Sequence, residues 1–184
     1  MRVIAGTARR LLLKTPKGDT TRPTTDQIKE TLFNILMPYL YDANFLDLFS
    51  GSGGIGIEAL SRGSRYAVFV ENSKPALKCI EDNLINTHFT DVSKIYPMDV
   101  FSALNQLEGK ESFDIVFMDP PYDNEIERQV LERLVSSNII NSDSLIVIEA
   151  STNTDIDYVS ELGYEIIKIK QYKNNMHVFL RREN

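Results

Sequence analysis

The chain lacks several features that mark whole classes of protein. It has no tryptophan, and Cys79 is its only cysteine, so no disulfide can form within the 184 residues. That cysteine content suits a reducing compartment, and we expect a cytoplasmic protein. No apolar run approaches the ~18 residues of a membrane span, so no membrane partner is expected. The two histidines, His88 and His177, lack the spacing of metal ligands, and we expect no metal site.

Positive charge is scarce over the whole chain but is concentrated at its start. The formal net charge is -6, which argues weakly against a nucleic-acid partner. Residues 1–30, however, carry seven basic and three acidic side chains, so the remaining 154 residues sum to -10. A basic segment on an acidic body can neutralise phosphates locally, whereas charge alone is equally compatible with a solvated terminus.

The length and composition favour one globular domain spanning residues 1–184, and we expect a monomer. Hydrophobic residues make up 42% and charged residues 25%, and no repeat or linker interrupts the chain. We divide the domain into a basic extension, 1–23, and a catalytic core, 24–184. In the extension, residues 2–4 and 11–13 are candidate hairpin strands. In the core, Thr24 is expected to cap a helix that Pro38 ends, with Gln27 completing a capping-box pattern.

From residue 44 onward, short apolar strands alternate with amphipathic helices, which predicts an α/β fold. Strands that are apolar on both faces belong in a parallel sheet covered by helices. Residues 164–170 and 176–181 instead predict a terminal antiparallel hairpin. We expect strands at 45–49, 66–71, 94–97, 113–119 and 144–149, and helices at 54–62, after Ser73, and at 125–137. In such sheets, ligands bind beyond the carboxyl ends of the parallel strands.

A glycine-rich motif follows the first core strand and opens a helix. Gly51, Gly53 and Gly56 match G-x-G-x-x-G, and Glu71 lies twenty residues after Gly51, where an acid can accept hydrogen bonds from ribose hydroxyls. Nicotinamide dinucleotides and S-adenosylmethionine both contain adenosine, so this pattern alone fits either cofactor and leaves a nicotinamide-dependent oxidoreductase open. Asp47 favours S-adenosylmethionine, because a carboxylate suits an ammonium group better than a pyrophosphate. The expected cofactor contacts are Asp47, Phe49, Gly51, Gly53, Gly54, Glu71, Asn72, Asp99 (toward the adenine amine) and Val100.

The tetrapeptide Asp119-Pro120-Pro121-Tyr122 closes the fourth core strand and indicates methyl transfer to an exocyclic base amine. Such an amine is a poor nucleophile, because its lone pair is delocalised into the ring. The Asp119 carboxylate and the Pro120 carbonyl can accept its two hydrogens and aim the lone pair. The prolines stiffen the loop, and Tyr122 offers a face for stacking. The base must be unpaired or flipped out of its helix to reach such a pocket, where methyl transfer would be direct and in line.

The residue type at position 119 favours guanine modestly. Guanine presents N1–H and the N2 amine side by side as donors, and a carboxylate can accept from both. Adenine presents a ring acceptor beside its amine, which an amide matches better. Alternatives that remain open are N6-adenine methylation of RNA or DNA, methylation of a protein glutamine, and a non-catalytic rRNA-binding assembly factor.

Taken together, these motifs resemble the small-subunit rRNA methyltransferase D family, whose members are bacterial 16S rRNA (guanine-966-N2)-methyltransferases. The resemblance covers essentially the whole chain. It is carried by residues 2–6, 21–26 with Glu30, 32–34, 47–63 and 119–122. Two departures occur: Thr7-Ala8-Arg9-Arg10 where the family usually has a glycine, and Lys173-Asn174-Asn175-Met176 where Gly-Asp-Thr commonly follows the tyrosine, which puts in doubt any role for that turn.

The resemblance implies a Rossmann-like, seven-stranded methyltransferase fold with S-adenosylmethionine as methyl donor. It implies that Asp119, Pro120 and Tyr122 hold a guanine of 16S rRNA in the small ribosomal subunit or an assembly intermediate. It also implies that the basic extension grips the RNA. The expected RNA contacts are Arg2, Arg9, Arg10, Lys14, Lys17, Arg22, Thr24 and Lys29.

Overall fold

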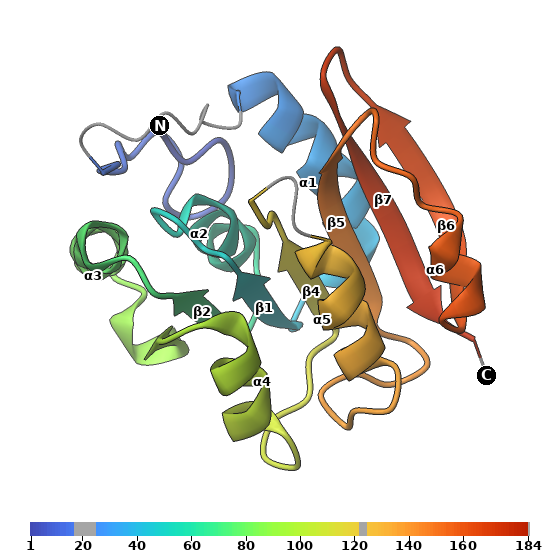
Figure 1. Ribbon diagram of the computed structural model, residues 1–184. Helices are drawn as coiled ribbons and strands as arrows, with labels where there is room; N and C mark the ends of the chain where they lie inside the picture. Colours follow the sequence, from blue (N-terminus) through green and yellow to red (C-terminus); the bar gives the residue numbers. More distant parts are fainter. Residues whose placement is uncertain (17–24, 122–124, 184) are drawn as a thin grey trace.

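The fold is built on one seven-stranded sheet with strand order β3-β2-β1-β4-β5-β7-β6 (Figure 1). It is seen in a computed structural model, which describes residues 1–16, 25–121 and 125–183. All neighbouring strands pair in parallel except β7, which is antiparallel to both β5 and β6. The predicted parallel sheet with an antiparallel C-terminal edge is confirmed.

The strands lie within a few residues of their predicted positions, and the central ones are short runs of apolar residues. Their bounds are β1 Asn44–Leu48, β2 Tyr66–Glu71, β3 Ser93–Pro97, β4 Ile115–Met118, β5 Leu145–Ser151, β6 Tyr164–Gln171 and β7 Asn175–Arg182. The helices are α1 Asp26–Leu40, α2 Gly54–Ser61, α3 Lys74–Thr87, α4 Val100–Leu107, α5 Ile126–Leu134 and α6 Tyr158–Glu161, with a 3-10 turn at Thr90–Val92.

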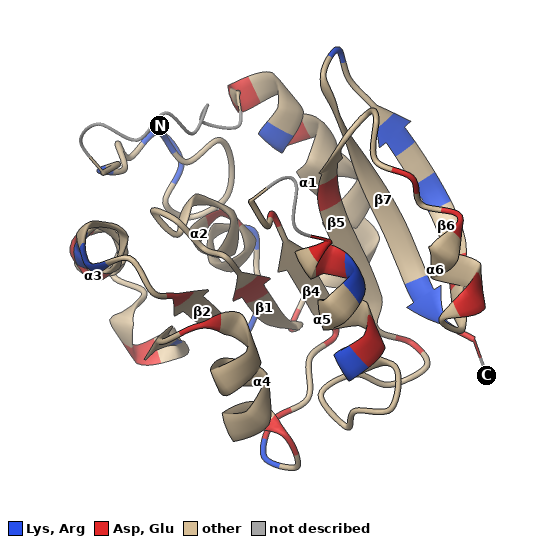
Figure 2. Ribbon diagram, viewed as in Figure 1, with Lys and Arg blue, Asp and Glu red and all other residues tan. Residues whose placement is uncertain are grey.

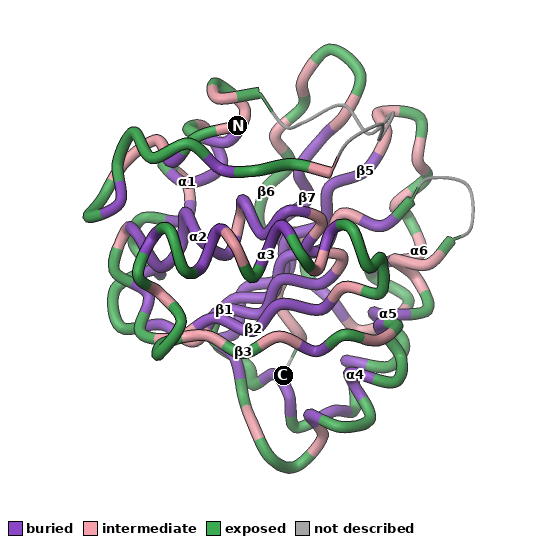
Figure 3. Tube along the Cα trace, turned by 90° about the vertical axis from the view of Figure 1, so that its left-hand side faces the viewer, coloured by how far each residue is buried: buried purple, intermediate pink, exposed green. Residues whose placement is uncertain are grey.

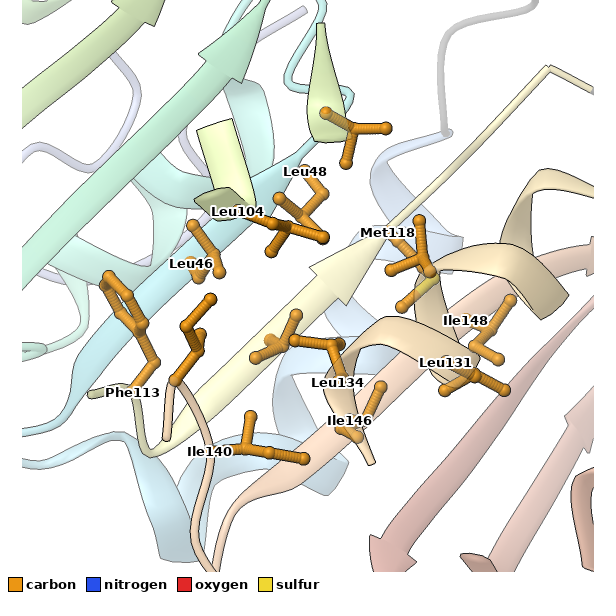
Figure 4. Close-up of a cluster of buried hydrophobic side chains, with 14 of the residues drawn as sticks. Leu46, Leu48, Leu104, Phe113, Met118, Leu131, Leu134, Ile140, Ile146 and Ile148 are labelled. Atoms are coloured by element: carbon orange, nitrogen blue, oxygen red, sulfur yellow. The ribbon is translucent and has the colours of Figure 1, made fainter. Parts of the chain in front are cut away.

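Helices cover both faces of the sheet and bury two separate apolar clusters (Figures 1 and 3). One cluster joins α4, α5 and α6 to side chains such as Leu46, Met118 and Ile148, which Figure 4 shows packed together. The other joins α1, α2 and α3 to Phe69 and Phe117 on the opposite face. Burial on both faces explains why the central strands are apolar at nearly every position.

Three of the helices depart most from the sequence expectation: α1 in its ends, and α4 and α6 because they were not predicted. Thr25, rather than Thr24, caps α1, and its hydroxyl accepts from the Ile28 N–H at 3.3 Å; Thr24 lies outside the described residues. Pro38 lies inside α1, which continues to Leu40 although proline removes one hydrogen bond of the helix; the buried side chains of Leu36 and Leu40 pack this turn against the core and offset that cost. The short helix α4 was not predicted; Asp99 caps it.

The N-terminal residues form a small hairpin that docks on α2 and α3. Arg2 and Leu12 form an isolated antiparallel bridge, so the predicted hairpin pairing is present but the two segments do not form full strands. Glu58, fully buried on α2, accepts the backbone N–H groups of Ile4 and Ala5 at 2.8 and 3.0 Å. On α3, the Asn83 side chain exchanges two hydrogen bonds with the backbone of Lys14. The hairpin is therefore fixed to the body of the domain.

Lys29 corrects one expected RNA contact. Its side chain is 1% exposed and its Nζ lies 3.2 Å from Glu58 Oε2 and donates to the Arg2 carbonyl at 2.5 Å. Glu58 is also paired with Arg62 at 2.8 Å. An amine that is buried and paired with a carboxylate in this way cannot contact RNA phosphates. Lys29 instead joins α1 to the N-terminal hairpin.

Candidate active site

A cavity of about 740 Å³ opens at the carboxyl ends of β1, β2, β4 and β5. Its volume falls within the range of small-molecule sites. The described lining residues come from both predicted motifs and from the N-terminal hairpin. Among the expected cofactor and catalytic residues, the wall includes Asp47, Phe49, Gly51, Gly54, Glu71, Asn72, Asp99, Val100, Asp119, Pro120 and Pro121. The structure therefore brings together residues that are up to 74 positions apart in sequence.

The glycine loop turns sharply between β1 and α2. Phe49, Gly51 and Gly53 have φ values of 62°, 55° and 77°. These values lie in the left-handed region, which residues other than glycine seldom adopt. A Cβ on Gly51 would meet nothing within 4 Å, so its backbone faces open space at the cavity. Gly53, the N-cap of α2, was expected to contact the cofactor but does not line the cavity. This cradle lets a ligand approach the backbone closely.

Asp47 lies at the bottom of the cavity and is 1% exposed. Its Oδ2 accepts from the Gly56 N–H at 2.9 Å, and a Cβ on Gly56 would lie 2.4 Å from the Phe69 ring, so α2 can approach the sheet this closely only with glycine there. Burial raises the pKa of Asp47 to about 7, the Gly56 N–H opposes this rise, and Glu71 adds to it. A nearby cation would favour the ionised form.

Glu71 braces the loop from the end of β2. Its Oε2 accepts from the Gly51 N–H at 2.8 Å, and its Oε1 accepts from the N–H groups of Asn72 and Ser73 at 2.8 and 2.7 Å. These three backbone bonds fix the carboxylate at the rim of the cavity. A carboxylate has about four lone-pair sites, so one remains for a ligand hydroxyl.

Asp99 follows β3 and caps α4. Its Oδ1 accepts from the backbone N–H groups of Phe101 and Ser102, both at 3.0 Å. Hydrogen bonds from the Ser102 side chain and then from these backbone groups hold the pKa of Asp99 below its usual value. The residue therefore stays ionised as an acceptor on the cavity wall.

Asp119 directly follows β4 and lines the same cavity as the glycine loop. Its side chain forms no ion pair with any described residue, while Pro120 beside it is buried. Burial, then Glu149 and then Asp47, hold the pKa of Asp119 well above its usual range. This carboxyl group is poised to take up a proton, which suits a general base. Tyr122 lies outside the described residues.

Glu149 is a cavity residue that sequence reasoning missed. It lies on β5, is 5% exposed, and follows the Met118–Ile148 pair that joins β4 to β5, so it neighbours Asp119. An acid near the end of an otherwise apolar strand was the available signal. Polar residues at the carboxyl ends of parallel strands meet at one edge of the sheet.

The expected RNA contacts other than the buried Lys29 divide into three groups. Arg9 and Arg10 are exposed on the N-terminal hairpin. Arg2 and Lys14 are exposed too, but each forms a surface ion pair, with Asp26 and Asp82. Met1, Thr15 and Pro16 of the same segment line the cavity, and Figure 2 shows blue bands for Lys and Arg beside the N-terminus. Lys17, Arg22 and Thr24 lie outside the described residues.

This donor set fits a cationic adenosine-containing cofactor. The wall supplies carboxylates for an ammonium group and for hydroxyls, and it supplies apolar side chains, such as Val70 and Ala76, for a flat ring. Among the described residues, no group of three or more His, Cys, Asp or Glu side chains could hold a metal ion. No described helix has the length and apolar character needed to cross a bilayer.

The chain is similar to known proteins over nearly its whole length. The family model described as conserved hypothetical protein 95 matches residues 1–181. Ribosomal RNA small subunit methyltransferase D of Haemophilus influenzae is 33% identical over 171 residues, which cover 92% of this chain and 88% of that protein.

Solved structures share the architecture. The structure of Escherichia coli yhhF is 30% identical in sequence and has a TM-score of 0.87. The match covers 100% of this chain and 98% of that one. The ribosomal protein L11 methylase of Lactobacillus delbrueckii subsp. bulgaricus has a TM-score of 0.72 at 15% identity, covering 97% of this chain and 89% of that one. The latter likeness concerns the fold alone, which is the Rossmann-like fold of methyltransferases.

Proposed function

We propose that the protein methylates the N2 amine of a guanine in 16S rRNA. The chain belongs to the family of conserved hypothetical protein 95. It is also a relative of ribosomal RNA small subunit methyltransferase D of Haemophilus influenzae. S-adenosylmethionine is the methyl donor. The single observation that carries the proposal is the position of Asp119 and Pro120 on the same cavity wall as the glycine loop and Asp47.

Each part of the cavity has a task in this proposal. Asp47 attracts the ammonium of the methionine moiety, Glu71 accepts from ribose hydroxyls, and Asp99 accepts from the adenine amine. When bound, the cofactor supplies an electrophilic methyl group on a sulfonium. Asp119 and the Pro120 carbonyl accept the hydrogens of the target amine, so that its lone pair faces the methyl group.

Asp119 also completes the proton balance. In the transfer, the amine nitrogen would form a bond to the methyl carbon as the bond between that carbon and the sulfonium sulfur breaks, and the nitrogen must then release one proton to become neutral again. Asp119, whose pKa burial raises, takes up that proton at its carboxylate. The target guanine has to leave its helix to reach these groups, which base flipping or an unpaired position provides.

Affinity for S-adenosylmethionine is expected to fall as the pH drops below about 7, the pKa of Asp47. The ionised carboxylate attracts the ammonium, and protonation removes that attraction, so affinity falls by up to about tenfold per pH unit. Calorimetric titration at about pH 6 and about pH 8 measures this. The Asp47→Asn variant should bind S-adenosylmethionine weakly at both pH values, and its affinity should no longer depend on pH. 5′-Methylthioadenosine, which lacks the ammonium, is the matched ligand; an equal pH effect on both ligands would exclude this role for Asp47.

Replacing Arg9 and Arg10 together by alanine is expected to weaken binding to small-subunit RNA. Both side chains are exposed on the N-terminal hairpin and form no ion pair with described residues. Each lost phosphate contact lowers the slope of log affinity against log salt by about one. Filter binding across a salt series measures the slope, and Lys78→Ala on α3 is a control for lost surface charge. An unchanged slope would place the RNA contact elsewhere.

The direct test of the proposal uses small subunits from a strain that lacks the modification. Incubation with the protein and methyl-labelled S-adenosylmethionine should transfer label into the RNA. Absence of label in RNA would exclude this function. We place the reaction in the cytoplasm, with the protein acting as a monomer on a subunit or its assembly intermediate.

A further inference from the structure

A chain of hydrogen bonds leads from the cavity wall to the turn between β6 and β7. Glu149 Oε1 accepts from Asn175 Nδ2 at 2.6 Å, and Glu149 Oε2 lies 3.2 Å from His177 Nε2. The other ring nitrogen of His177, Nδ1, lies 3.2 Å from the Tyr172 hydroxyl. The side chains of Glu149 and His177 are 7% and 0% exposed. The roles assigned above make no use of this network.

The network holds the carboxylate of Glu149 in one orientation. Because a carboxylate can only accept, Nε2 of His177 carries the hydrogen that bonds to Glu149, and the Tyr172 hydroxyl bonds to the other ring nitrogen, Nδ1. Phe117, Tyr172 and Phe179 meet the imidazole edge-on at 6.2, 5.2 and 6.4 Å between ring centroids, so the ring cannot swing away. Buried networks of this kind hold their members rigidly.

Glu149 stands beside the group that is proposed to hold the target amine. It lies on the cavity wall with Asp119, and the two are close enough for the charge of Glu149 to act on Asp119. Each oxygen of Glu149 accepts one hydrogen bond from the rear, and a carboxylate oxygen has two lone pairs. Acceptor capacity therefore remains toward the cavity.

We propose that Glu149 selects the base by accepting a hydrogen bond from guanine N1–H while Asp119 and Pro120 hold the N2 amine. This inference rests on the proposed function. A carboxylate fixed between two donors offers only lone pairs, so it accepts N1–H and repels the N1 lone pair of adenine or 2-aminopurine. His177, Tyr172 and Asn175 are positioning residues that keep Glu149 aimed. The turn whose sequence departs from the family pattern thereby acquires a role.

The test compares guanine with 2-aminopurine, which keeps the target amine but has a lone pair at N1. Small subunits are reconstituted with 16S rRNA that carries either base at the methylated position, and kcat/KM is measured for each. The wild-type protein should prefer guanine roughly 10- to 100-fold, the value of one hydrogen bond to a charged group. In Glu149→Gln the amide can donate to N1, so the rate on guanine should fall and the preference should shrink to within about threefold.

Two comparisons separate selection from structural support. A merely structural role for Glu149 would lower both rates together in Glu149→Gln, and an unchanged preference would overturn the inference. Glu165→Gln is the matched control: it changes an exposed carboxylate on β6 outside the network and should leave both rates and the preference unchanged. If Glu149→Gln does not fold, the wild-type protein still decides, because equal rates on the two bases overturn the inference alone. Failure to methylate guanine at all would instead reject the proposed function, and this inference with it.

Discussion

Replacing Asp119 by alanine is expected to lower the rate of methyl transfer by roughly 10²- to 10⁴-fold, the range for a lost acid–base group. The variant loses the carboxylate that orients the amine and receives its proton. Affinity for S-adenosylmethionine should stay within about threefold, because Asp47, Glu71 and Asp99 are unchanged. Single-turnover transfer at saturating cofactor measures the first quantity, and calorimetry measures the second.

Two further variants serve as controls for this result. Asp119→Asn keeps the size and one acceptor oxygen but cannot take up the proton, so it should lose less activity than Asp119→Ala. Asp91→Ala removes an exposed carboxylate near the start of β3 and should leave the rate unchanged. The melting temperature of Asp119→Ala should not fall, since burial already disfavours the ionised carboxylate in the folded state. Turnover close to that of the wild-type protein would contradict the role given to Asp119.

Replacing Glu58 by alanine is expected to lower the free energy of unfolding by about 3–5 kcal/mol, the cost of breaking a buried ion pair from one side. Glu58 is fully buried and pairs with Lys29 and Arg62. It also accepts the backbone N–H groups of Ile4 and Ala5, so four donors lose their partner at once. The N-terminal hairpin would be released as well, and affinity for RNA should fall with stability. Chemical denaturation and filter binding measure the two effects.

Two further variants calibrate the loss. Lys29→Met should cost less than Glu58→Ala, because Glu58 keeps Arg62 and both backbone donors. Glu81→Ala breaks an exposed pair with Lys78, and such pairs contribute about 0–1 kcal/mol. If Glu58→Ala were as mild as Glu81→Ala, the buried cluster could not be what fastens the hairpin.

Much of the fold could be predicted because periodicity reports burial directly. A run such as Tyr66–Glu71, apolar on both faces, is compatible with a central parallel strand, and its observed bounds match the prediction. Helix α4 was missed for a physical reason: its eight residues lie between Asp99 and a turn, too short a span for helical periodicity to stand out. Pro38 led to a helix end that was predicted too early, since the burial of Leu36 and Leu40 holds the last turn in place despite the proline.

The site was predictable where it depends on strand ends and not where it depends on tertiary contacts. Asp47, Glu71, Asp99 and Asp119 each follow or end a strand, and the topology alone gathers them. The burial of Lys29 depends on how α1 meets α2, which its local sequence does not report. The Glu149–His177 bond likewise joins residues 28 positions apart on antiparallel strands.

Nucleoside mass spectrometry of 16S rRNA tests the central claim most directly. Small subunits that lack the modification are incubated with S-adenosylmethionine and either the wild-type protein or Asp119→Ala, and the rRNA is then digested to nucleosides. We predict that N2-methylguanosine appears with the wild-type protein and is nearly absent with the variant. Formation of N6-methyladenosine instead, or equal yields of N2-methylguanosine from both proteins, would contradict it.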